Sequence, residues 1–150
     1  MSRAVAQMRA DAVSDDMWSA PTPCTEWDVR ALTNPGHDPV ATYARAAVDA
    51  RAALEALPSL SVVVELSAGP KSVQRYCDEV GADTLIHTWD LAHAVGADGR
   101  LPADLLGVAA TVVESWLKPQ GIPGVLAARL DVPDDADAPT RLLAALGRRA

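Results

Sequence analysis

The sequence predicts a mainly α-helical protein whose helices pack as a bundle, with a short extended pair at one end. Apolar residues recur at helical spacing over most of the chain, and the prolines fall between these segments. Only residues 61–67, "SVVVELS", carry the run of β-branched side chains that favours a strand. The 150 residues suffice for one domain with a sizeable core, and no linker or repeat divides residues 1–150.

The N-terminal part of the chain is predicted to contain three helices. Apolar positions in residues 2–17 have loosely helical spacing, and the loop "SAPTPC" follows them. Thr25 is placed to cap a short helix, "TEWDVRALT", with Asp28 three residues later as the acidic partner of a capping box. Pro39 suits the first position of the next helix, which runs to about Leu57.

After the extended segment, the chain is predicted to return to helices. A long helix spans Ser72 to Val95 and ends at Gly96. A second helix, "ADLLGVAATVVESWL", follows the turn "GRLP", and "TRLLAALGRR" forms a last helical turn or two. Between these two helices, one short strand is predicted at residues 128–132.

The charge of the chain argues against two classes of partner. Acidic residues outnumber basic ones by 20 to 13, the net charge is −7, and the arginines are scattered. Binding to nucleic acid, or to an anionic membrane surface, requires a basic patch. No run is long enough to cross a membrane, and residues 1–16 contain acids where a signal peptide needs an uninterrupted apolar core. The sequence therefore predicts a cytoplasmic protein without nucleic-acid or membrane partners.

The two cysteines, Cys24 and Cys77, lie far apart in the sequence and form no Cys-X-X-Cys pair. In a reducing cytoplasm they are expected to be free thiols. Two interpretations stay open, because both can be small buried hydrophobic residues, or one of them can line a thiol or metal site.

The polar residues of the long helix form the strongest functional signal. In "DTLIHTWDLAH", Asp83 and His87 are four residues apart, which puts them about 40° apart around a helix. Asp90 lies three residues beyond His87 on the same side. This stripe is predicted to face the interior because of its neighbours, Val80, Thr84 and Leu91.

Two interpretations of this stripe remain open. A carboxylate and an imidazole at this spacing can bind one divalent cation, and zinc, nickel, iron and manganese accept such donors. A third protein ligand must then come from another helix. In the other interpretation, the same two groups form a half-buried, hydrogen-bonded polar pair. His93 points away and is expected in solvent, and Trp89 is expected to serve packing.

Three stretches of the chain resemble one protein family. "DDMWSAPTPCTEWDVRALTN" (15–34) resembles the opening signature of the mycothiol-dependent maleylpyruvate isomerase-like family, within the DinB-like metal-binding superfamily. "DTLIHTWDLAHAVGADGRLPADLL" (83–106) is similar to its second signature, and "DVPDDADAPTRLLAALGRR" (131–149) to the C-terminal stretch of many small members. The combination of "PTPC.EW.V" with "HTWDLA" is more specific than either piece alone.

The resemblance implies a DinB-like four-helix bundle that holds a divalent metal, with zinc as the expected ion, through three protein ligands. One ligand of the family is a His on the helix after the "PTPC" loop, and the others are an acidic residue and a His four apart. Asp83 matches the acidic ligand, in place of the Glu of the isomerase branch, and His87 matches the second His. The metal would activate a thiol, mycothiol in the characterised branch, for isomerisation or thiol transfer.

The first family His is where this sequence departs from the pattern. That His directly follows the asparagine matched by Asn34, and here Pro35 takes its place. The chain passes from "RALTN" to "GHDPVATYARA", so the helix after about residue 34 is shortened. His37 is a weaker substitute ligand in one interpretation, and in the other it faces solvent or caps the next helix. With only two protein ligands, metal affinity is expected to fall.

Three functional hypotheses follow. The first is a metal-dependent isomerase or thiol transferase acting on a small molecule or thiol, with ligands Asp83, His87 and His37 and with Asp90 orienting His87. The second is a metal-free binding module that covers exposed apolar faces by homo-oligomerisation. The third is a truncated gene product with little stability, which would unfold without cooperativity.

Overall fold

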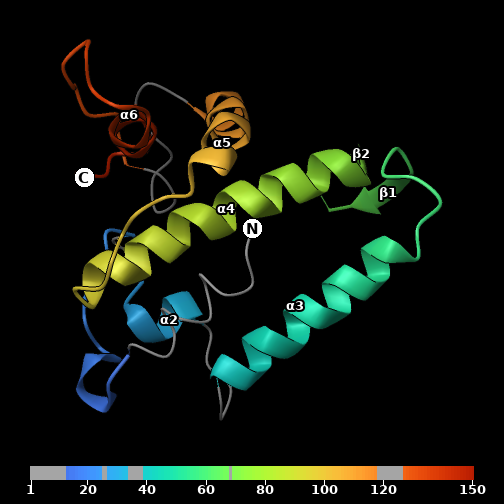
Figure 1. The fold of residues 1–150 in the computed structure, drawn as a ribbon, viewed down its shortest axis with the longest axis horizontal. Coiled ribbons are helices and arrows are strands. Elements are labelled where there is room, and N and C mark those ends of the chain that lie inside the picture. The colour runs from blue at the N-terminus through green and yellow to red at the C-terminus, as the bar shows by residue number, and fades with distance from the viewer. Residues whose placement is uncertain (1–12, 25–26, 34–38, 68, 118–126) are drawn as a thin grey trace.

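The computed structural model describes residues 13–24, 27–33, 39–67, 69–117 and 127–150, and this part of the chain is mainly helical (Figure 1). A short antiparallel sheet of two strands accompanies the helices. In chain order, the elements are η1 (Asp15–Met17, a 3-10 turn), α2 (Val29–Thr33), α3 (Pro39–Glu55), β1 (Val63–Leu66), β2 (Gly69–Ser72), α4 (Val73–Ala94), α5 (Ala103–Trp116) and α6 (Ala138–Ala145).

Helix α4 is the long central helix, and its ends confirm the boundaries predicted from the sequence. The Ser72 hydroxyl accepts a hydrogen bond from the backbone N–H of Arg75 at 3.2 Å, which caps the first turn. At the other end, Gly96 has a φ of 66°, and the N–H of Ala97 donates to the carbonyl of Ala92 at 2.8 Å. Neither α4 nor any other described helix is long and apolar enough to cross a membrane.

The hydrophobic core lies between α4, α5 and α6. In Figure 1, α5 and α6 both lie on one side of α4. Helix α4 contributes apolar residues that recur every three or four positions, so they form one stripe along the helix. Full burial of a side chain such as Leu85 contributes about 1.5–3 kcal/mol. The core residues are Ala82, Leu85, Ile86, Trp89, Leu101, Ala109, Val112, Val113, Leu142, Leu143 and Leu146.

Helix α6 ends in a turn that reverses the chain toward α4. The N–H of Gly147 donates to the carbonyl of Ala144 at 3.0 Å, and the N–H of Arg148 donates to the carbonyl of Leu143 at 2.9 Å. This pair of bonds is a Schellman motif, which needs a left-handed residue at Gly147, whose φ is 76°. A Cβ atom at this position would also lie 2.5 Å from the Cβ of Ala127. Glycine is therefore required here, and the turn sets the position of Arg148.

Helix α3 stands apart from α4 in Figure 1, on the side opposite α5 and α6. Over residues 41–55, every side chain except those of Ala44 and Ala47 is exposed. With 17 residues, α3 is only slightly longer than the length at which isolated helices are marginal in water. Its packing against the rest of the described chain is therefore a weak source of stability.

The two-stranded sheet confirms the predicted extended pair at one end of the molecule. Val63 pairs with Ser72 and Leu66 pairs with Gly69, so β2 leads directly into α4. An ion pair between Lys71 Nζ and Glu79 Oε2, 2.5 Å apart, ties β2 to the first turns of α4.

Of the helix predicted at residues 2–17, residues 2–12 lie outside the described residues, and Asp15–Met17 form only the 3-10 turn η1. The last predicted helix ends at Ala145, before residue 149. Two further element predictions were wrong. The short helix α2 begins at Val29 and not at residue 25, because the Asp28 carboxylate accepts the N–H of Ala31 at 2.8 Å and acts as the cap itself. Thr25 lies outside the described residues. The strand predicted at residues 128–132 is not formed, since the N–H of Leu130 donates to the end of α6, at the carbonyl of Ala144, 2.9 Å away.

Candidate functional site

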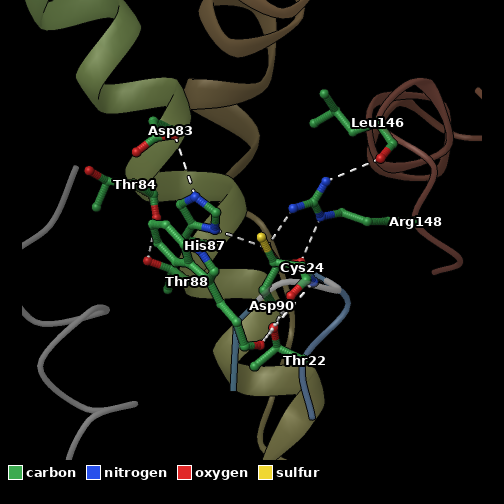
Figure 2. A network of polar contacts seen from close by, with 10 residues as sticks. Thr22, Cys24, Asp83, Thr84, His87, Thr88, Asp90, Leu146 and Arg148 are labelled. Carbon is green, nitrogen blue, oxygen red and sulfur yellow. Dashed lines mark hydrogen bonds and ion pairs between the residues drawn. The ribbon is translucent and has the colours of Figure 1, made fainter. Parts of the chain in front are cut away.

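The carboxylate of Asp90 is fully buried on α4 and is held by Arg148 from the segment after α6 (Figure 2). Nε of Arg148 lies 2.6 Å from Oδ1 of Asp90, and Nη2 lies 2.7 Å from Oδ2. The Arg148 side chain is only 4% exposed, and its Nη1 donates to the carbonyl of Leu146 at 3.1 Å. This two-pronged contact joins two charges in a site that solvent hardly reaches.

Arg148 also determines the charge of Asp90. Burial disfavours the ionised carboxyl, but hydrogen bonds from Arg148 and His87 and the charges of both outweigh it, so the pKa of Asp90 lies below its usual value. Asp90 is therefore a carboxylate at neutral pH, and a carboxylate only accepts hydrogen bonds.

The imidazole of His87 lies against this carboxylate. Its Nδ1 is 3.0 Å from Oδ2 of Asp90, which is the contact expected between residues three apart on one helix. Because Asp90 can only accept, the neutral ring carries its proton on Nδ1. The second nitrogen, Nε2, then has a free lone pair and can accept a proton or bind a cation.

Trp27 fixes the plane of the His87 ring. The two rings are stacked, with centroids 5.6 Å apart and planes inclined by 17°. The loop before α2 presents Trp27 because the Thr22 hydroxyl donates to the carbonyl of Trp27 at 2.6 Å and accepts the N–H of Cys24 at 3.2 Å. Sequence reasoning gave Trp27 no role at the site, although it belongs to the "PTPC.EW.V" pattern.

Asp83 lies on the other side of His87, one turn earlier on α4 (Figure 2). Its Oδ1 is 3.5 Å from Nε2 of His87, and its side chain is 62% exposed. The prediction that the whole stripe faces the interior was therefore wrong for Asp83 and for Val80, which is also exposed, but right for Leu91. Helix α2 has only five residues and contacts α4.

One line of contacts thus runs from the surface into the core, through Asp83, His87, Asp90 and Arg148. The His87 side chain is 25% exposed, so Nε2 sits at the boundary between the exposed carboxylate and the buried one. Arg148 was missed by sequence reasoning. Gly147 is a sequence signal for the end of α6, although the predicted helix ran past it, and it does not say where the following side chain points.

The other candidate residues take simpler roles. His37 lies outside the described residues. Cys24 and Cys77 are free cysteines, as expected, and both are half-buried. Trp89 packs in the core as expected. His93 is exposed as expected, but its ring is also stacked on Trp89, with centroids 4.9 Å apart.

The donor set at the site suits a metal ion only in part. Among the described residues, no three His, Cys, Asp or Glu side chains are grouped so that they could hold one. Asp83 and His87 supply two donors of suitable type. The contact between Nδ1 and Asp90 has the form found behind metal-binding histidines, in which the other ring nitrogen donates to a carboxylate.

No protein-family model, curated protein or solved structure matches the chain.

Proposed function

We propose that the protein binds a divalent metal ion through Asp83 and His87, with zinc as the expected ion. The protein would then be of the DinB-like four-helix-bundle type and act as a mycothiol-dependent isomerase or thiol transferase, as the sequence resemblance implies. The single observation that supports it most is the contact between Asp90 and Nδ1 of His87, which leaves Nε2 free beside Asp83. An imidazole that is oriented by a carboxylate behind it, next to a second exposed carboxylate, supplies two ligands of the types that metal sites use.

Each residue of the line has a separate task in this proposal. Arg148 keeps Asp90 ionised, and Asp90 holds the proton on Nδ1 of His87. Trp27 restricts rotation of the ring. A bound divalent ion would supply the acidification of a thiol or water at neutral pH. Because Asp83 and His87 are partly exposed, a small-molecule substrate or thiol has access to them.

The experiment is metal analysis of the protein purified without chelator. We expect about one equivalent of zinc, as in sites with one ion, and its loss in His87→Ala. His93→Ala is the matched control, because His93 is an exposed histidine on the same helix. Equal zinc in wild type and His87→Ala would overturn the proposal, and so would a folded wild type that takes up no zinc.

The second candidate function is a metal-free module that works through homo-oligomerisation. The observation that favours it is the exposure of large apolar side chains on two helices, Tyr43, Val48 and Leu54 on α3 and Val80 on α4. Light scattering after size exclusion tests it. A dimer or larger assembly that Val48→Glu dissociates supports this function, and a monomeric wild type contradicts it.

A further inference from the structure

A cavity lies between α5 and α6, and no residue of the Asp83–His87–Asp90–Arg148 line contributes to it. Its volume is about 300 Å³, within the range of small-molecule pockets. The walls are apolar side chains of both helices, Leu106, Ala110 and Val113 from α5 and Leu142 and Ala145 from α6. Such a concave apolar wall suits the hydrophobic body of a small ligand.

Two arginines lie at the opening of this cavity, although the whole chain has a net charge of −7. Arg129 and Arg141 lie on the rim with Glu114, and all three are exposed. Asp137, which caps α6, lies close enough to Arg141 to interact with its charge, so the match to a carboxylate rests on the guanidinium donors and not on net charge. Guanidinium groups bind carboxylates with paired hydrogen bonds.

Both arginines stand on backbone that belongs to α6 or is hydrogen-bonded to it next to the arginine. Arg141 lies on α6, where one of its nitrogens donates to the carbonyl of Ala136, and a guanidinium has further N–H donors for a ligand. Arg129 precedes Leu130, whose N–H donates to the carbonyl of Ala144 on α6. The backbone at both arginines is therefore anchored beside the apolar walls.

We infer that the cavity between α5 and α6 binds a small monocarboxylate with an apolar body about the size of a phenyl ring. The apolar part lies against the helix walls, and the carboxylate is held at the rim by Arg129 and Arg141. This site goes beyond the metal site, because its ligand contacts neither Asp83 nor His87.

The experiment is a ¹H–¹⁵N NMR titration of the full chain with 3-phenylpropionate and, separately, with its neutral amide. The acid is expected to shift amides of α5 and α6 and to bind about tenfold more tightly than the amide, because the amide lacks the charge-assisted hydrogen bonds. Arg129→Gln and Arg141→Gln are each expected to weaken binding of the acid and to leave binding of the amide unchanged. Arg149→Gln, an exposed arginine outside the cavity, is the control and leaves both unchanged.

Gly107→Leu tests the cavity without disturbing the arginines. Gly107 lines the cavity, and a Cβ atom there meets no other atom within 4 Å, so the larger side chain fills free space. It is expected to abolish binding of the acid. Equal affinity for acid and amide, shifts outside α5 and α6, or no binding of either compound would overturn the inference. A change of oligomeric state in Gly107→Leu would also overturn it, since the cavity would then be a protein interface.

Discussion

The carboxylate of Asp90 and the guanidinium of Arg148 form a two-pronged buried ion pair, although the residues are 58 positions apart in the sequence. The pair joins the middle of the protein to its C-terminal segment. Because Asp90 also contacts His87, the same pair determines which nitrogen of His87 carries the proton. Stability and site geometry therefore depend on one interaction.

The first prediction concerns the stability that this pair provides. Asp90→Asn and Arg148→Met should each lower the free energy of unfolding by about 3–5 kcal/mol, because each leaves a buried charge without its partner. The double variant should lose less than the sum of the two, as measured by urea denaturation. Arg149→Met, next to Arg148 but exposed, should change stability little. Additive losses would show that the two side chains do not interact.

The second prediction concerns the turn after α6. Gly147→Ala should lower stability, because Gly147 has a positive φ and its Cβ position is filled by Ala127. Gly81→Ala on α4 is the matched control, since a Cβ atom there has nothing within 4 Å, and it should stabilise the helix by about 0.5–1 kcal/mol. Thermal unfolding of both variants checks the prediction. Equal melting temperatures for the two would contradict it.

The third prediction concerns acid. Hydrogen bonds from Lys71 and Arg75 outweigh burial and hold the pKa of Glu79 below its usual value. A lowered folded-state pKa gives stability that is present above the unfolded pKa and is lost as the pH falls through the folded one. Between pH 5 and about 3, Glu79→Gln and Lys71→Met should therefore lose less stability than wild type in urea denaturation. If the free energy of unfolding of both variants fell with pH in parallel with that of wild type, the lowered pKa of Glu79 would be contradicted.

Much of the fold could be predicted because its signals are local. Ser72 and Gly96 mark the ends of α4 by side-chain and backbone preferences that act within one turn. Pro39 marks the start of α3 in the same way. The spacing of His87 and Asp90 likewise places both on one side of a helix, and their side chains are in contact.

The remaining features depend on contacts between distant parts of the chain. Nothing near Arg148 in the sequence shows that it reaches Asp90, because the turn at Gly147 and the packing of α6 decide this. The exposure of Asp83 depends on which other segments pack against that part of α4, and the periodicity of α4 alone carries no such information. The stacking of Trp27 on His87 also joins two distant parts of the chain, so neither part predicts it alone.

The most direct test is a long-range ¹H–¹⁵N NMR spectrum of the His87 ring, recorded before and during a zinc titration. Before zinc, we expect the proton of neutral His87 on Nδ1, beside Asp90. As zinc is added, the Nε2 resonance should shift and saturate near one equivalent, about the stoichiometry of a single site, and Asp83→Asn should weaken the response. A proton on Nε2, or an Nε2 resonance that zinc leaves unchanged, would contradict a metal site at Asp83 and His87.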